Sequence, residues 1–152
     1  MSDVNEQGML SYCRACESKN RIPFNKLHRK GNCARCGMPL RHVSQVMHLV
    51  WEDIFWRCVR TASVPVLIAF VHDVSSEKEL EAELEVAASC AFGDYAVGIV
   101  ELERNPGLAN DFKLKELPTM ILFKQGVDMG RLVQRLGGKG FEMYVRGLID
   151  YQ

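Results

Sequence analysis

Four of the six cysteines lie in one short N-terminal stretch, and they constrain the fold more than any other feature of the chain. They form two Cys-x-x-Cys pairs, Cys13/Cys16 and Cys33/Cys36, with sixteen residues between the pairs. Two such pairs complete the tetrahedral four-thiolate shell that Zn²⁺ accepts. The spacing predicts one structural zinc ion in a ribbon over residues 9–41, because a segment this short needs a staple in place of a core.

Two other uses of these thiols remain open from the residues alone. The pairs can act as redox dithiols, or they can hold iron. His28 and His42 are spare candidate ligands, although four cysteines already complete a zinc shell. A closed shell leaves no open position for water, so we expect the ion to hold structure and not to perform hydrolysis.

Charge is unevenly distributed along a chain whose formal net charge is zero. Residues 9–42 contain eight Lys or Arg and one acid, whereas residues 73–103 contain nine acids and one Lys. We expect this contrast to allow a homodimer in which the basic ribbon meets an acidic helix. Nucleic-acid binding through the ribbon is a weaker alternative, because only Tyr12 and Phe24 offer stacking groups there.

The sequence contains no targeting signal that we recognise. The N-terminal residues are polar, and no run approaches eighteen apolar residues, so we expect neither a secretory signal nor a membrane span. This predicts a cytoplasmic protein, in which clustered cysteines favour metal over disulfides.

From residue 43 onward, strand-like and helix-like stretches alternate, which is typical of an α/β or α+β domain. Residues 64–71 are apolar throughout, as expected for a central strand covered on both faces. Ser76 and Glu79 have the spacing of a capping box at the start of a helix over residues 77–90. We expect further strands over 43–49, 95–103, 120–124 and 129–136, and further helices over 51–60, 108–112 and 139–150.

Two parts of the sequence are similar to one known family. The segments "PVLIAF", "ERNPGLANDFKLKELPTMILFKQG" and "RLV" resemble thioredoxin over residues 43–152. The stretch "YCRACESKNRIPFNKLHRKGNCARCGMPL" is similar to the zinc ribbon of one class of bacterial thioredoxins. The resemblance implies an α/β thioredoxin fold, a central mixed sheet flanked by helices, over residues 42–152. It places the zinc ribbon at 9–41 and a tail at 1–8.

The redox dithiol of that family has no counterpart at the matching positions. Where the family carries Cys-Gly-Pro-Cys this chain reads "SSEK", so Ser75 and Lys78 occupy the two cysteine positions. Neither side chain can exchange a disulfide. The resemblance also places the family's buried acid at Ala69 and the lysine facing it at Ile99. Because a lone buried charge is costly, the joint loss of both charges is what a redox-inactive member should show.

The substrate-facing loop of the family is retained in "ELPT". The resemblance implies a cis-proline at Pro118 and a groove that holds an extended peptide. The position that lines this groove after the last strand is Gln134, which implies a narrower or differently selective groove. The residues implied to contact a peptide are Leu117, Pro118, Thr119, Val74 and Ser75. We therefore expect a redox-inactive, zinc-binding module that binds proteins or peptides, or acts like a chaperone.

A thiol-disulfide oxidoreductase that uses other cysteines is the main alternative. It would act through Cys58, Cys90 or ribbon thiols that release zinc on oxidation. Helical spacing places Cys58 on an inner stripe and Cys90 near a helix end, which favours structural thiols. A hydrolase triad of His72, Asp73 and Ser75 is disfavoured, because residues so close in sequence rarely reach the relay geometry.

Overall fold

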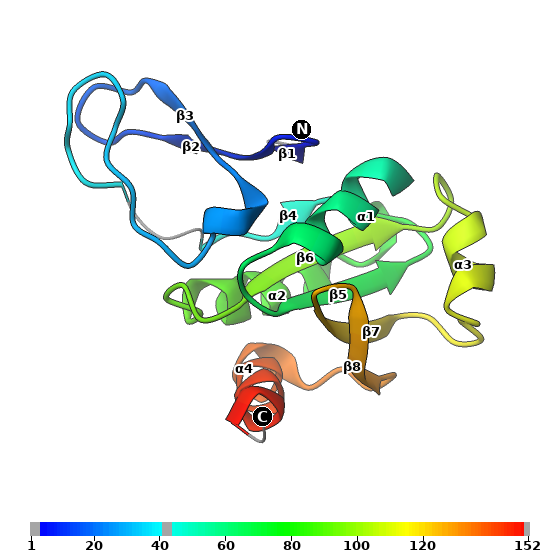
Figure 1. Cartoon of the computed structure of the whole chain (residues 1–152). Helices are drawn as coiled ribbons and strands as arrows, with labels where there is room; N and C mark the ends of the chain where they lie inside the picture. Colours follow the sequence, from blue (N-terminus) through cyan, green and yellow to red (C-terminus); the bar gives the residue numbers. More distant parts are fainter. Residues whose placement is uncertain (1–3, 41–43, 151–152) are drawn as a thin grey trace.

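The computed structural model describes residues 4–40 and 44–150, and a five-stranded mixed sheet lies at its centre. The sheet has the order β4-β6-β5-β7-β8 (Figure 1). β4 (Met47–His48), β6 (Ala96–Glu101) and β5 (Val66–Val71) are parallel. β7 (Thr119–Lys124) is antiparallel to β5, and β8 (Val127–Leu132) is antiparallel to β7. The sheet therefore combines a parallel half with an antiparallel hairpin.

Helices cover both faces of this sheet, and β5 lies between them. α1 (Glu52–Thr61) and α3 (Gly107–Asp111) contribute to one apolar cluster, and α2 (Lys78–Ser89) and α4 (Gly137–Asp150) to the other. Figure 1 shows α1 and α4 on opposite sides of the sheet. All six residues of β5 are buried, and they alternate between the two clusters. The prediction of a central strand covered on both faces is therefore confirmed.

Two local predictions differ from the structure. The capping box is wrong, because α2 begins at Lys78 and Glu77 makes no side-chain cap. The Asp73 carboxylate instead accepts the Ser76 amide at 2.9 Å and closes a short 3-10 turn, η2 (Val74–Ser76), ahead of the helix. The strand expected over 43–49 is only Met47–His48, and residues 41–43 lie outside the described residues.

The N-terminal unit, residues 4–40, is built on a three-stranded antiparallel sheet. β1 (Val4–Asn5) pairs with β2 (Gly8–Tyr12), which pairs with β3 (Lys19–Ile22), and η1 (Phe24–Lys26) follows. Part of the segment assigned to a tail thus forms a strand. Gly8 allows the close approach of these strands, since a Cβ there would lie 2.1 Å from the Ile22 carbonyl oxygen.

The N-terminal unit shares its apolar core with the helix–sheet domain. Phe24 and Leu27 are almost fully buried in the cluster that also contains Phe55 and Cys58 of α1. The Ser63 amide donates to the Phe24 carbonyl at 3.0 Å, and His28 Nδ1 lies 2.8 Å from the Ser63 hydroxyl. Because these contacts join segments far apart in sequence, we expect both parts to unfold together.

Phe24→Ala tests this shared core. Removing a buried aromatic ring costs about 3 to 5 kcal/mol of unfolding free energy in a well-packed site. We expect a loss near the lower end of that range. It should appear in urea unfolding followed by the fluorescence of Trp51 and Trp56, which lie outside the N-terminal unit. The matched control is Tyr12→Ala, since Tyr12 is 50% exposed in β2. An unchanged tryptophan transition in Phe24→Ala would mean that the two parts unfold separately.

Candidate metal centre and substrate-facing groove

The four cysteines predicted to bind metal converge at the end of the N-terminal unit that lies far from the five-stranded sheet. Their sulfur atoms all lie within 4.8 Å of one another, and all four are free thiols. Cys13 Sγ is 3.5 Å from Cys36 Sγ, and Cys16 Sγ is 3.7 Å from Cys33 Sγ. Sulfur atoms bound tetrahedrally at about 2.3 Å from an ion are about 3.8 Å apart. The four-cysteine cluster can therefore hold a metal ion.

The two Cys-x-x-Cys turns have matching backbone geometry. The amide of Glu17 donates to the Cys13 carbonyl at 2.8 Å, and the amide of Gly37 donates to the Cys33 carbonyl at 2.9 Å. Both donor residues have a positive φ, 63° at Glu17 and 77° at Gly37. At each pair, the backbone therefore turns back directly after the second cysteine. This repeated turn brings each pair of sulfur atoms to one point.

Hydrogen bonds favour the thiolate form at two of the four cysteines, Cys33 and Cys16. At Cys36, by contrast, the hydrogen bond from the Met38 backbone is outweighed by burial and by the neighbouring Cys13, Cys16 and Cys33, which raise the pKa of Cys36 to about 12. The Ser18 hydroxyl lies 3.1 Å from Cys33 Sγ and 3.0 Å from Cys16 Sγ. Hydrogen bonds from Ser18, and further ones from backbone and Asn20 donors, lower the pKa of Cys33 to about 5. Ser18 likewise lowers the pKa of Cys16. Thiolate is the form that binds metal ions, so these neighbours suit a metal site.

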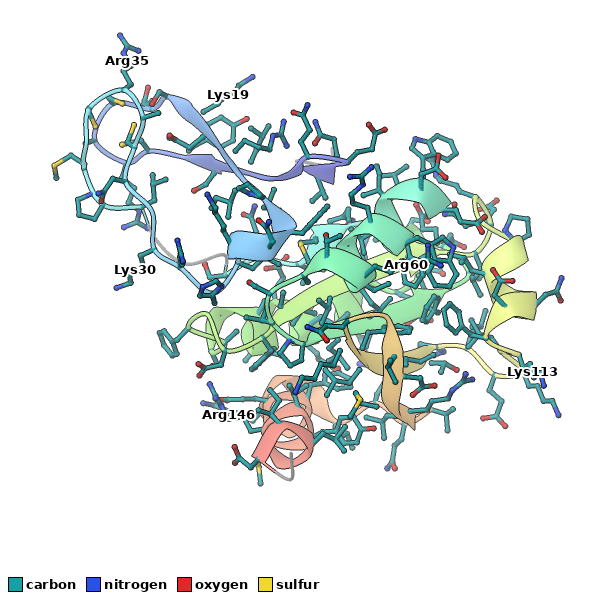
Figure 2. The ribbon with its side chains drawn as sticks, in the orientation of Figure 1. Lys19, Lys30, Arg35, Arg60, Lys113 and Arg146 are labelled. Carbon is teal, nitrogen blue, oxygen red and sulfur yellow. The ribbon has the colours of Figure 1, made fainter. Side chains whose placement is uncertain are left out.

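The spare histidine ligands do not join this cluster in the described residues. His28 contacts Ser63 near α1 and is not among the residues grouped with the four sulfurs. His42 lies outside the described residues. Basic side chains project from the N-terminal unit instead, and Figure 2 shows Lys19, Lys30 and Arg35 pointing outward from different sides of it.

The loop that follows β5 is closed by hydrogen bonds to Asp73. Ser75 Oγ donates to Asp73 Oδ1 at 2.7 Å, and the Ser76 amide donates to the same oxygen. These bonds, with a smaller effect of His72, lower the pKa of the Asp73 carboxyl. A carboxylate with a lowered pKa is a weak general base, so it does not activate the Ser75 hydroxyl as a nucleophile. Lys78, at the other matched position, begins α2.

The interior beneath this loop is apolar. Ala69 of β5 is fully buried, and its register partners are Ile99 on β6 and Met120 on β7. None of these three residues carries a titratable group. The sheet therefore offers no buried acid or lysine at the two positions where the resemblance implied them.

Three segments meet at the end of the sheet that carries the C-terminus of β5. They are the loop at 72–77, the segment before β7 and the segment after β8. Thr119 at the start of β7 pairs with Phe70, and Leu132 near the end of β8 pairs with Met120. This register brings the cis Leu117–Pro118 bond and the segment after β8 to the edge that carries the loop at 72–77. The cis-proline prediction is confirmed. The surface bounded by these three segments, where the resemblance implied a peptide groove, is called the Pro118 groove below.

Residues predicted to contact a peptide differ in their exposure. Leu117 is 44% exposed and Ser75 is also exposed, while Val74 and Pro118 are half-buried. Thr119 is buried, and its hydroxyl donates to the Glu116 carbonyl, so only its backbone is offered to a ligand. Beyond β8, Val133 is 56% exposed and Gln134 is exposed too. No pattern in the sequence marks Val133, because its position next to the paired residue Leu132 follows only from the register of β7 and β8.

The two remaining cysteines lie on different faces of the sheet. Cys58 is fully buried in the cluster beneath α1, and burial raises its pKa strongly, so it is unreactive. Cys90 is half-buried at the end of α2, and its carbonyl accepts from Arg146 at 2.9 Å. With the sheet between their helices, these thiols cannot form a disulfide in this fold.

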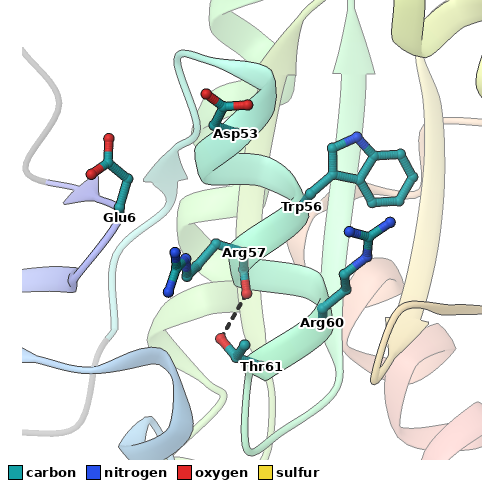
Figure 3. Close-up of a pocket in the computed structure, with 6 residues that line it drawn as sticks. All are labelled: Glu6, Asp53, Trp56, Arg57, Arg60 and Thr61. Carbon is teal, nitrogen blue, oxygen red and sulfur yellow. Dashed lines mark hydrogen bonds between the residues drawn. The ribbon is translucent and has the colours of Figure 1, made fainter.

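A pocket of about 510 Å³ opens at the junction of the two parts (Figure 3). It lies between the β1–β2 turn and α1, and charged groups of both signs line it. Its lining residues are Glu6, Asp53, Trp56, Arg57, Arg60 and Thr61. Arg60 stacks over the Trp56 ring at 4.5 Å, and the Thr61 hydroxyl donates to the Arg57 carbonyl. The pocket thus presents no free nucleophile among these lining residues.

The acidic face of α2 is largely engaged within the molecule. Arg135 pairs with Glu79 and Glu83, His48 lies 3.2 Å from Glu81, and Glu85 accepts the Val46 amide. These contacts reduce the charge available to a second copy of the chain. In the part of the chain that the structure describes, no helix is both long and apolar enough to cross a membrane.

Two known thioredoxins are similar to this chain in sequence. Thioredoxin of Mycolicibacterium smegmatis is 33% identical over 104 residues, which cover 66% of this chain and 90% of that protein. Thioredoxin C-3 of Corynebacterium nephridii is 25% identical over 126 residues, 82% of this chain and 84% of that protein. No family model matches the sequence. Because it is 33% identical to the Mycolicibacterium smegmatis thioredoxin over 90% of that protein, the chain belongs to the thioredoxin family.

Solved structures agree on the fold. A mutant thioredoxin of Halobacterium salinarum superposes with a TM-score of 0.60 at 19% identity, over 70% of this chain and 92% of that one. The thioredoxin of Trypanosoma brucei brucei gives a TM-score of 0.57 at 18% identity, over 71% and 94%. The predicted mixed α/β thioredoxin-like fold is therefore confirmed.

Asp73→Ala tests the closed loop through its pH dependence. Because the folded-state pKa of Asp73 is lowered, its stabilising effect is complete above the unfolded pKa, about 4, and is lost as pH falls through the folded value. We expect Asp73→Ala to lower stability at pH 7 and to lose less additional stability on acidification to pH 3 than the unmodified chain. Urea unfolding at both pH values measures this. Glu77→Ala, whose side chain caps no amide, is the control, and equal pH profiles of the two variants would contradict the assignment.

Proposed function

We propose that this chain is a zinc-containing member of the thioredoxin family that binds an extended polypeptide segment in the Pro118 groove. In this proposal the loop after β5 performs no dithiol exchange. The observation that carries it is the contrast at one sheet edge. Asp73 holds Ser75 in a closed, sulfur-free loop, while Leu117 and Val133 remain exposed beside the cis-proline.

Binding would combine backbone pairing with burial of apolar side chains. A peptide in extended conformation can pair with the backbone on either side of Pro118, because that segment leads directly into β7. Burial of Leu117 and Val133 would add about 25 cal/mol for each Å² of apolar surface removed from water. Such a groove favours apolar, unfolded segments over a particular sequence, which suits a chaperone-like role.

The four-cysteine cluster would hold one zinc ion through four thiolates. Its sulfur spacing, its paired turns and the Ser18 hydrogen bonds support this use. Zinc has no redox chemistry, and a closed shell supplies structural stability alone. The ion would thereby fix the end of the N-terminal unit, whose other end packs against α1.

Thiol-disulfide exchange at the cluster is the second candidate. The lowered pKa values of Cys33 and Cys16 favour it, because thiolates are the nucleophiles in that reaction. The relatives, which are named thioredoxins, point toward redox chemistry as well. A tightly bound ion opposes it, since all four sulfurs would be engaged.

Metal content and stability provide the test of the zinc site. We expect one zinc per chain by native mass spectrometry, and its loss in Cys33→Ser but not in Cys90→Ser. Because the N-terminal unit shares the core beneath α1, Cys33→Ser should also lower the melting temperature measured by tryptophan fluorescence. Full zinc retention in Cys33→Ser would exclude the four-cysteine site.

Peptide binding is tested with two exposed valines. We expect Val133→Asp to weaken binding of a fluorescent, carboxymethylated unfolded polypeptide at least five-fold by anisotropy. A charge in an apolar contact costs more than about 1 kcal/mol, which corresponds to that factor. Val127→Asp is the matched control, because Val127 is 59% exposed in the same hairpin and lies away from the groove.

Reductase activity on a protein disulfide separates the two candidates. The unmodified zinc-loaded chain should show none, and Ser75→Cys with Lys78→Cys should introduce activity. Equal effects of Val133→Asp and Val127→Asp on binding would contradict the proposal that a polypeptide binds in the Pro118 groove. Activity in the unmodified chain that is lost on Cys33→Ser would establish the second candidate.

A further inference from the structure

His72, Asp73 and Glu103 bring three metal-binding side chains together outside the cysteine cluster. One ligand atom from each lies within 4.8 Å of the other two. His72 and Asp73 directly follow β5, and Glu103 lies two residues after the end of β6. β5 and β6 are parallel neighbours, and the carboxyl ends of parallel strands are where α/β sheets bind ligands.

The backbone fixes the spacing of these residues. The Leu102 amide donates to the Val71 carbonyl at 2.8 Å, and the Glu103 amide donates to the His72 carbonyl at 3.1 Å. The pairing of the two strands thus continues past their ends and holds His72 beside Glu103. The hydrogen bonds from Ser75 and Ser76 reach only Oδ1 of Asp73, so Oδ2 remains available.

The three side chains interact only weakly with one another, because His72 has a small electrostatic effect on Asp73. Within residues 4–40 and 44–150, no hydrogen bond or ion pair joins the His72 imidazole to either carboxylate, although all three groups converge. The neighbouring cation, Arg104, turns away, since its Nε lies 3.4 Å from Glu101 Oε1 and its guanidinium lies over the Trp51 ring. Two carboxylates and an imidazole therefore face one small space without a protein cation between them.

We propose that His72, Asp73 and Glu103 form a surface site for a divalent transition-metal cation of the Mn²⁺ type. Donor atoms bound to one such cation are about 3 to 4 Å apart at bond lengths near 2.1 Å, so small side-chain rotations complete the site. Two carboxylates and one imidazole suit Mn²⁺, whereas the thiolates of the cysteine cluster suit zinc. Three protein ligands leave the remaining positions to water. The site goes beyond the proposed function and does not depend on it.

Mn²⁺ titration of the zinc-loaded chain, followed by the electron paramagnetic resonance of free Mn²⁺, tests the site. We expect one Mn²⁺ per chain, and at least about ten-fold weaker binding in both His72→Ala and Glu103→Gln. The matched control is Glu77→Gln, which removes a carboxylate from the same loop but leaves the three ligands in place. Binding that is undetectable in the unmodified chain, or weakened equally by all three variants, would overturn the site.

A measurement on the unmodified chain avoids any effect of substitution on folding. Bound Mn²⁺ broadens nearby amide resonances, so the signals of His72, Asp73 and Glu103 should broaden first in a nuclear magnetic resonance titration. Broadening centred on the glutamates of α2 would instead indicate diffuse attraction to the acidic helix and contradict the proposal.

Discussion

The burial of β5 on both faces is the constraint on which the rest of this structure depends. Its six residues are apolar, and alternate side chains serve the two clusters beneath α1 and beneath α2 and α4. Each fully buried large side chain contributes about 1.5 to 3 kcal/mol, and a shift of one residue in register would exchange the two faces. The loop at 72–77, the Pro118 segment and Glu103 all owe their positions to this strand and its two neighbours.

The N-terminal unit depends on the same core through α1. Phe24 and Leu27 pack in the apolar cluster beneath α1. The Ser63 amide, just after α1, donates a hydrogen bond to the Phe24 carbonyl in η1. The cysteine cluster lies at the other end of the unit, so an ion there would stabilise packing far from itself. We therefore expect a metal ion bound at the tip to affect the stability of the helix–sheet domain through this shared core.

Chemistry at the carboxyl end of β5 differs from that of a dithiol enzyme at every level. The interior at Ala69, Ile99 and Met120 is apolar, the loop above it carries a serine held by Asp73, and the buried Cys58 lies on the other face. What remains exposed is an apolar edge at Leu117 and Val133 and a convergence of His72, Asp73 and Glu103. These features are the basis of our proposals that the chain binds a polypeptide and a cation and performs no dithiol exchange in this loop.

Much of the fold and part of the candidate site could be predicted because the signals are local. The apolar run of β5, the helical stripe of α1 and the Cys-x-x-Cys spacing each follow from neighbouring residues. The start of α2 could not be predicted from Ser76 and Glu79, because the Asp73 carboxylate competes for the Ser76 amide and closes a separate turn. The spacing of Ser76 and Glu79 takes no account of other acceptors. In the folded loop the Ser76 amide has two possible acceptors, the carboxylates of Asp73 and Glu79, and it donates to Asp73.

By itself, the sequence determined which four cysteines can share one metal ion, which strand is central and that the loop after it contains no thiol. These depend on residue type and short-range spacing. Only the tertiary structure decided that Phe24 belongs to the core beneath α1, that Val133 follows β8 at the end of the sheet where β7 begins, and that Glu103 meets His72. Those contacts join residues brought together by sheet register, and register is set by the sum of many weak contacts that no local pattern records.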